Sequence, residues 1–172
     1  MDFCFEIESG ASCPLRGFVI RADHNYLYGL EFVLKEDGRP GATTEPNPVH
    51  RATCRQLSSY LAGKLRVFDL PLMPKGTVFQ QKVWKEIAAI PFGTTVTYGE
   101  IARRLGDPHL ARAVGQAANR NPLPVVIPCH RVVGQGGHLT GFAPGLPTKV
   151  FLLGLEKGDM LWQVREAGAS VF

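Results

Sequence analysis

Long apolar runs are missing from this chain of 172 residues. No run approaches the roughly 18 residues that a membrane-spanning helix needs. The start, MDFCFEIESG, also lacks the basic and then apolar pattern of a secretory signal. We therefore expect a soluble, cytoplasmic protein with no membrane partner.

Cysteine is also scarce, and its spacing excludes two common uses. Cys4, Cys13, Cys54 and Cys129 lie far apart without a C-x-x-C pair. This spacing argues against a disulfide framework and against a zinc site built from neighbouring residues. Reduced thiols are the expectation.

The chain does contain enough apolar sequence for a core. Hydrophobic residues make up 45% of the composition, which suffices for one ordinary domain or two small ones without metal or disulfide staples. The net charge of +4 suits a polyanionic partner. Because 15 acidic residues are interspersed, this charge alone does not identify nucleic acid as the partner.

Residues 1–74 have the pattern of a small α/β domain. FCFEIE alternates apolar and polar residues, and GFVIR and YLYGLEFVL follow with a turn at ADHN, so the first 34 residues predict an antiparallel meander. After the polar surface loop EDGRPGATTEP, Asn47 and Pro48 begin a helix that Gly63 ends. VFDLPL then predicts a short strand. The stretch 73–76 separates this pattern from a helical one, so we place the second domain at 75–172.

The second domain is predicted to be mainly helical. Thr77 with Gln80 and Thr97 with Glu100 form capping boxes that open two helices. A third helix, HLARAVGQAANR, follows directly after Gly106 and a short turn. The last two helices predict a helix-turn-helix, although pairs of this kind are also common as plain scaffold.

The outer face of the third helix lacks the lysines and glutamates of an ordinary solvated surface. One long cation, Arg112, projects among Ala111, Ala113 and Gly115. Small neighbours permit close approach to a groove, and a guanidinium suits phosphate contact or insertion between bases. We therefore interpret this face as a candidate DNA contact.

Cys129, in NPLPVVIPCHRVVG, is the candidate nucleophile. LPVVIP predicts a short strand bracketed by prolines with Cys129 at its end, a favourable place for a reactive group. A lone cysteine between apolar runs can also be a buried, inert residue, which is our interpretation of the other three. Cys129 differs because His130 and Arg131 follow it, and a thiol with a pKa of about 8.5 needs a base or a positive field to form thiolate.

His130 is either that base or a structural histidine. Adjacent residues rarely face each other in an extended segment, so His130 would act on the thiol through a bridging water. An orienting carboxylate would complete such a relay. The predicted helix from Pro147 to Lys157 offers Glu156 near its C-terminus, where the helix dipole disfavours a carboxylate. From its position alone, we interpret Glu156 as a solvated charge.

Six segments together resemble the alkylguanine-DNA alkyltransferases, also called methylated-DNA–protein-cysteine methyltransferases. They are GTVFQQKVW, TYGEIARRLG, ARAVGQAANRNP, IPCHRVV, LTGF and KVFLLGLE, and the match runs from about Phe68 to Gly158. The resemblance implies an RNase H-like N-terminal α/β domain followed by a helical domain with a helix-turn-helix. It also implies DNA repair by irreversible transfer of an alkyl group from O6-alkylguanine to Cys129, once per molecule and without a cofactor. The partner would be double-stranded DNA, bound through its minor groove by a monomer that flips the damaged base.

The resemblance also implies residue roles. Cys129 would be the acceptor, His130 its water-mediated base, and Glu156 the carboxylate that orients His130. Asn121 would brace the turn around the cysteine, and Tyr98 would donate a proton or hydrogen bond to the leaving purine and contact DNA. Arg112 would fill the space of the extruded base, with Ala111, Ala113 and Gly115 close to the DNA. The implied pocket comprises Ala118, Pro124, Val132, Phe142 and Ala143.

The sequence departs from the family pattern at three places. GFAPGL replaces the commoner G-Y-x-G-G-L, so Phe142 lacks a hydroxyl and Pro144 stiffens the loop. Ala118 stands where some members carry methionine and could leave room for bulkier adducts. Asp23 and Tyr28 occupy positions of two zinc ligands found in some members, so we expect no structural metal.

Two other functions remain open at the level of the sequence. A non-catalytic sensor of alkylated bases would transfer no alkyl group, and a thiol hydrolase would turn over many times. An alkyl acceptor would react once. The tail 159–172 contains no motif that indicates a function.

Overall fold

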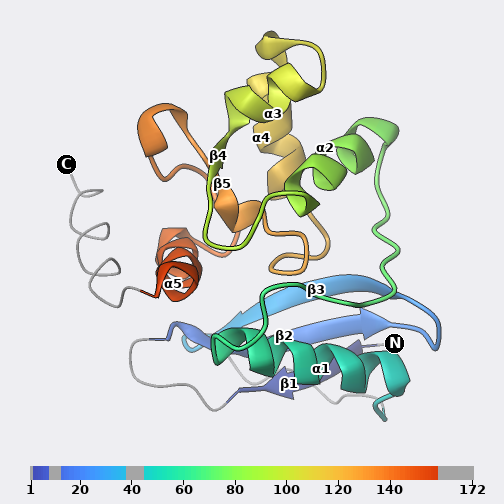
Figure 1. Ribbon diagram of the computed structural model, residues 1–172. Coiled ribbons are helices and arrows are strands. Elements are labelled where there is room, and N and C mark those ends of the chain that lie inside the picture. Colours follow the sequence, from blue (N-terminus) through green and yellow to red (C-terminus); the bar gives the residue numbers. More distant parts are fainter. Residues whose placement is uncertain (1, 8–12, 38–44, 159–172) are drawn as a thin grey trace. The chain divides into compact units, whose positions relative to one another are not determined.

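The computed structural model describes residues 2–7, 13–37 and 45–158, and the chain divides into two units, Met1–Lys75 and Gly76–Phe172 (Figure 1). Most of the expected surface loop, residues 38–44, and the tail 159–172 lie outside the described residues. Within the described part of the chain, no helix combines the length and apolarity that crossing a membrane requires.

The first unit is built on a three-stranded antiparallel sheet in the order β1 (Asp2–Glu6), β2 (Leu15–Ala22), β3 (Leu27–Leu34). The predicted meander is therefore confirmed. Its second turn forms as expected, because the Asp23 carboxylate accepts hydrogen bonds from the backbone N–H groups of Asn25 and Tyr26, both at 2.8 Å. Apolar residues of β2 and β3 are buried, including Leu15, Phe18, Ile20, Leu27 and Leu30. A register shift between Leu15 and Gly17 interrupts the alternation of buried and less buried positions along β2.

Helix α1 (Pro48–Leu61) packs against β2 and lies across one face of the sheet (Figure 1). Asn47 caps it as predicted, with a reciprocal hydrogen bond from its own backbone N–H to the His50 ring. Past its end, Gly63 has φ of 71°, a left-handed conformation that favours glycine. Val49 and Leu57 of this helix are buried, whereas Cys54 and Leu61 are only half-buried.

The strand predicted at VFDLPL is wrong. Only Leu72 forms an isolated bridge, to Leu27. The backbone of Asp69 is instead bound at both its N–H and its carbonyl by the side-chain amide of Gln56. Since Pro71 has no N–H to donate, a regular ladder cannot run through this segment.

In residues 76–158, the described part of the second unit, four longer helices are joined by short connecting elements. In chain order they are α2 (Val78–Ala88), β4 (Val96–Thr97), α3 (Tyr98–Arg104), η1 (Pro108–Leu110), α4 (Ala111–Asn119), η2 (Cys129–Arg131), β5 (Val132–Val133), η3 (Gln135–Gly137) and α5 (Leu146–Lys157). Both predicted capping boxes, at Thr77 and Thr97, are confirmed. β4 and β5 pair in parallel, which brings the start of α3 next to the segment that follows Cys129.

The core of this unit lies where α2, α3 and α4 pack together. Val83, Ile87, Ile101 and Val114 are fully buried there. Trp84 is buried as well, and its indole N–H donates a hydrogen bond to the carbonyl of Ala117 at 2.8 Å. Gly106, with φ of 97°, makes the turn that lets α3 and α4 meet.

The strand predicted at LPVVIP is also wrong. Residues 123–128 form turns with one isolated bridge between Pro124 and Ile127, and Cys129 opens the 3₁₀ helix η2. Val125 has φ of 73°, which no β-strand residue adopts. The segment has strand-like composition, but a side chain outside it, Asn121, determines its path.

Candidate active site

Cys129 is the first residue of η2, and only 6% of its surface is exposed. The side-chain amide of Asn121 donates hydrogen bonds to the Cys129 sulfur at 3.2 Å and to the carbonyl of Ile127 at 2.7 Å. The Asn121 oxygen accepts from the backbone N–H of Leu123 at 3.0 Å. One side chain thus braces both ends of the loop that delivers the thiol.

That loop also stores backbone strain. Val125 is β-branched and buried, and it is the non-glycine residue with positive φ in the described part of the chain. Such a conformation costs on the order of 1–3 kcal/mol and persists only where surrounding contacts impose it. Here the imposed conformation lies four residues before the cysteine.

The thiol of Cys129 is protonated at rest. Burial raises its pKa above the usual range, against the opposing effects of the Asn121 hydrogen bond, the charge of Lys149 and the backbone N–H groups of Cys129 and His130. A buried thiol of this kind needs a base to remove its proton before it can act as a nucleophile. The same four groups, Asn121, Lys149 and the two backbone N–H groups, would stabilise the thiolate once it forms.

His130 is fully buried next to the cysteine, and its Nε2 lies 2.8 Å from Oε1 of Glu156. Burial lowers the pKa of the imidazole, so the resting ring is neutral. An ionised carboxylate can only accept hydrogen bonds, so Nε2 carries the proton. Nδ1 is then the basic nitrogen of the ring.

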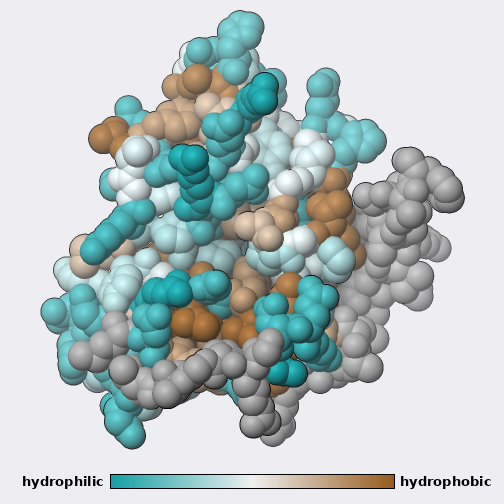
Figure 2. Space-filling model, turned by 180° about the vertical axis from the view of Figure 1, so that it is seen from behind, coloured by the Kyte–Doolittle hydropathy of each residue, from teal (hydrophilic) through white to brown (hydrophobic). Residues whose placement is uncertain are grey.

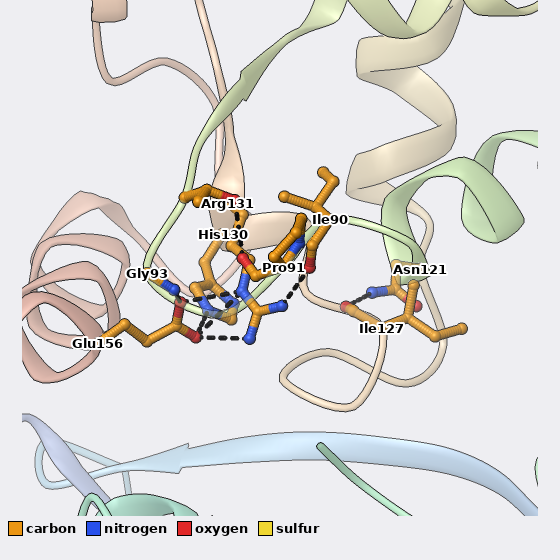
Figure 3. Close-up of polar contacts among 9 residues, drawn as sticks. Ile90, Pro91, Gly93, Asn121, Ile127, His130, Arg131 and Glu156 are labelled. Atoms are coloured by element: carbon orange, nitrogen blue, oxygen red, sulfur yellow. Dashed lines mark hydrogen bonds and ion pairs between the residues drawn. The ribbon is translucent and has the colours of Figure 1, made fainter. Parts of the chain in front are cut away.

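Glu156 is buried, and its interpretation as a solvated charge is therefore wrong. Although burial raises its pKa, hydrogen bonds from His130, Arg131 and the N–H of Gly93 lower it to about 2. The dipole of α5 disfavours a carboxylate at this position, but partners from outside α5 stabilise it. Figure 3 shows that the partners come from η2 and from the segment between α2 and β4.

Lys149 is a buried residue of this site that the sequence argument missed. Its ammonium donates hydrogen bonds to the carbonyls of Val132 at 2.6 Å and Thr140 at 3.1 Å, and burial lowers its pKa to about 8. The Tyr98 hydroxyl donates to the same Thr140 carbonyl at 3.3 Å. The helical spacing of the sequence could have identified Lys149 as a site residue. Lys149, Leu152 and Glu156 stand at i, i+3 and i+7, so both ionisable residues lie on the apolar face of α5.

The residues expected to contact DNA lie on or beside α4. Arg112 is exposed, while Ala111, Ala113 and Gly115 are half-buried around it. Tyr98 packs next to Gly115, where a side-chain carbon would come within 3.8 Å of its ring. The space-filling view shows hydrophilic side chains projecting from the end of the second unit that carries α3 and α4 (Figure 2).

The expected pocket residues differ in burial. Ala118, Pro124 and Val132 are buried, in α4, in the loop before Cys129 and in β5, respectively. Phe142 is half-buried with its ring 6.0 Å from the Lys149 ammonium, and Ala143 is exposed. The loop 140–145 is tied to the site through Thr140.

No cluster of three or more His, Cys, Asp or Glu residues that could hold a metal ion occurs in residues 2–7, 13–37 and 45–158. Asp23 serves as a turn residue. Cys13 is buried, whereas Cys4 and Cys54 are half-buried, and burial raises the pKa of both half-buried thiols, that of Cys54 to about 11. Cys129 differs from these three because its sulfur accepts a hydrogen bond from the side-chain amide of Asn121.

The fold and site together define a protein with a small α/β unit and a mainly helical unit, in which a buried thiol is held by an asparagine amide and the next residue, a histidine, is hydrogen-bonded to a buried carboxylate. Residues 78–158 match the family described as 6-O-methylguanine DNA methyltransferase, DNA binding domain. A methylated-DNA–protein-cysteine methyltransferase from Methanosarcina acetivorans is 48% identical over 145 residues, 83% of this chain and 93% of that protein. The constitutive one from Bacillus subtilis is 42% identical over 155 residues, 86% and 93% of the two chains.

Solved structures agree with these relatives. Mycobacterium tuberculosis OGT, crystallised in complex with DNA, superposes with a TM-score of 0.79 at 36% identity and covers 95% of this chain and 96% of its own. The chain therefore belongs to the methylated-DNA–protein-cysteine methyltransferase family.

Proposed function

We propose that this protein repairs DNA by transferring the alkyl group of O6-alkylguanine to the sulfur of Cys129. The observation that carries the proposal is the position of this thiol, held by Asn121 at 3.2 Å and followed directly by an imidazole that Glu156 orients at 2.8 Å. Family membership supports the same activity. Asn121, Tyr98 and Arg112, the residues to which we assign further roles, also match the family pattern.

The reaction is a displacement at the alkyl carbon. His130 takes the thiol proton at Nδ1 through a water molecule, and the sulfur forms a bond to carbon while the bond from carbon to guanine O6 breaks. The electron pair of that bond leaves with the purine. The hydroxyl of Tyr98, whose pKa burial raises, stays protonated at neutral pH and donates a hydrogen bond or proton to the leaving base.

The product determines how often the protein works. A thioether has no good leaving group and no bond that water hydrolyses readily, so the alkyl group stays on Cys129. Each molecule therefore reacts once, which distinguishes this mechanism from that of a thiol hydrolase. We propose a monomer as the working unit, because one chain can supply the acceptor, the base, the carboxylate and the tyrosine that the reaction needs.

DNA binding is assigned to α3, η1 and α4, which we propose form a helix-turn-helix entering the minor groove. The exposed residues there include Arg103, Arg104, His109, Arg112 and Arg120, so the surface is basic. The damaged atom lies inside the duplex, and extruding its base costs a few kcal/mol. Arg112 offsets part of this cost by filling the space that the base leaves.

Two further assignments follow the family. The first unit, with three antiparallel strands and α1 on one face, is proposed to be of RNase H-like form. With a DNA substrate, we expect the protein in the compartment that holds DNA: the cytoplasm, associated with the nucleoid, in a prokaryote, or the nucleus in a eukaryote.

The test is the intact mass of the protein after mixing with a duplex that contains O6-methylguanine. The expected result is a gain of one methyl group per molecule, with no further repair by protein that has already reacted, and no gain in a Cys129→Ser variant. A protein that binds the lesion without any change in mass would be a sensor. Repeated turnover with unchanged mass would identify a hydrolase.

A further inference from the structure

We propose that Arg131 is a positioning residue for alkyl transfer: its guanidinium fixes the Glu156 carboxylate and keeps the neighbouring His130 uncharged and able to accept a proton. This inference rests on the proposed function, because it assigns Arg131 a part in the same reaction. Arg131 does not touch the thiol in the contacts described above, so its effect would pass through Glu156.

The contacts of Arg131 are unusually complete for a buried cation. Its Nε lies 2.9 Å from Oε2 of Glu156 and 3.2 Å from Oε1, and its Nη2 donates to Oε1 at 2.9 Å. Arg131 is 5% exposed and the carboxylate is buried. A guanidinium that grips both oxygens of a carboxylate fixes the plane of that carboxylate as well as its distance.

A second set of contacts fixes Arg131 itself. Its Nη1 donates to the carbonyl of Ile90, and its guanidinium carbon lies 5.7 Å from the centre of the Phe92 ring. The N–H of Gly93 donates to Oε2 of Glu156 at 3.0 Å. The segment after α2 thus holds both members of the ion pair, as Figure 3 shows. Glu156 cannot rotate away from His130 without breaking several of these bonds.

The charges of the cluster explain why the pair matters for His130. Glu156 carries one negative charge and faces His130, Arg131 and the N–H of Gly93, while the positive charges of Arg131 and Lys149 both disfavour a proton on the imidazole. Arg131 already neutralises the carboxylate. A proton on the resting imidazole would therefore place a second positive charge beside Glu156 in a buried site.

Removing the guanidinium reverses this balance. Glu156 would then lose the fixed charge of its guanidinium partner but keep His130, and the pair of Glu156 and His130 would retain a proton up to higher pH, whether on the carboxylate or on the imidazole. A protonated pair leaves no basic nitrogen for the thiol proton. Alkyl transfer by an Arg131→Gln variant should therefore be slow at neutral pH and recover as the pH rises.

The experiment measures single-turnover transfer from O6-methylguanine duplex to excess protein across a pH series, read by intact mass. For Arg131→Gln we expect a rate at neutral pH lower by about 10-fold or more, part of the ~10²–10⁴-fold that a positioned general base contributes. The acid limb of its pH profile should move to higher pH. Arg131→Lys keeps the positive charge but loses the guanidinium that contacts both carboxylate oxygens. The acidic side of its pH profile should therefore lie at the wild-type pH, while its transfer rate should be lower. Arg51→Gln, an exposed arginine on α1, is the matched control and should match the wild type.

The outcomes separate the two proposals. If the wild type gains no methyl group, the proposed function fails. If the wild type reacts but Arg131→Gln slows by the same factor at every pH, Arg131 is merely structural and the inference fails. In a Glu156→Gln background, replacing Arg131 should slow the reaction no further, and a second, independent loss would contradict action through Glu156. Should Arg131→Gln fail to fold by circular dichroism, Arg131→Met takes its place, because it also removes the charge and introduces no unpaired polar group. An acid limb of Arg131→Met that stays at the wild-type pH would contradict the inference.

Discussion

Replacing Glu156 by glutamine should destabilise the second unit strongly at neutral pH. The change removes the charge of the carboxylate and leaves the buried guanidinium of Arg131 uncompensated. Loss of one partner of a buried ion pair costs about 3–5 kcal/mol. The lowered pKa of Glu156 gives a similar stabilisation energy independently, since a fall from 4.5 to about 2 corresponds to about 3 kcal/mol.

The sign of the pH dependence follows from the lowered pKa. A carboxyl whose folded pKa lies below its unfolded value stabilises the folded state above the unfolded value, and this stabilisation is lost as the pH falls through the folded value. The free-energy difference between the wild type and Glu156→Gln should therefore be full above about pH 4.5 and shrink toward pH 2. Other carboxylates are common to both proteins and cancel in the difference.

Urea unfolding followed by tryptophan fluorescence suits this measurement, because Trp84 is buried in the core of the second unit. Glu86→Gln is the control: its pair with Arg104 is 4.0 Å long and partly exposed, and such surface pairs contribute only about 0–1 kcal/mol. The reasoning would be refuted if Glu156→Gln unfolded within about 1 kcal/mol of the wild type at neutral pH, with a parallel pH curve.

Two further changes test the parts of the site. Asn121→Ala should lower the free energy of unfolding by about 1–3 kcal/mol, because it leaves the Ile127 carbonyl and the Leu123 N–H without their partner. It should also slow alkyl transfer. An unchanged unfolding free energy and an unchanged transfer rate would show that Asn121 does not hold the loop before Cys129 in place. Arg112→Ala should slow repair of a methylated duplex by roughly 10-fold or more, because it removes the residue proposed to offset the cost of base flipping, yet leave reaction with free O6-methylguanine unchanged. Equal loss with both substrates would assign Arg112 to the chemistry instead.

Local signals in the sequence predicted the elements that local contacts determine. The capping residues Asn47, Thr77 and Thr97 bond to groups three positions away, so their helices could be placed before any tertiary contact was known. The meander of β1, β2 and β3 was predictable for a similar reason, since short turns join strands with clear alternation. The thiol was found because Cys129 has basic neighbours in the chain.

Long-range contacts determine what the sequence did not reveal. VFDLPL and LPVVIP have the composition of strands, but Gln56 and Asn121 bind their backbones from outside, and Pro71 interrupts one of them. Glu156 is disfavoured by the dipole of its own helix and is stabilised by Arg131, which lies 25 residues away in the chain. The spacing of residues within a single helix or strand does not predict contacts with partners so distant in the chain.

The most direct test of the account is to locate the transferred carbon within the protein. A duplex with an isotopically labelled methyl group on guanine O6 is mixed with the protein, which is then digested and mapped by mass spectrometry. The account predicts one label per molecule, confined to the peptide that contains Cys129, with Cys4, Cys13 and Cys54 unlabelled. Label on another cysteine, or repaired DNA alongside an unlabelled protein, would contradict it.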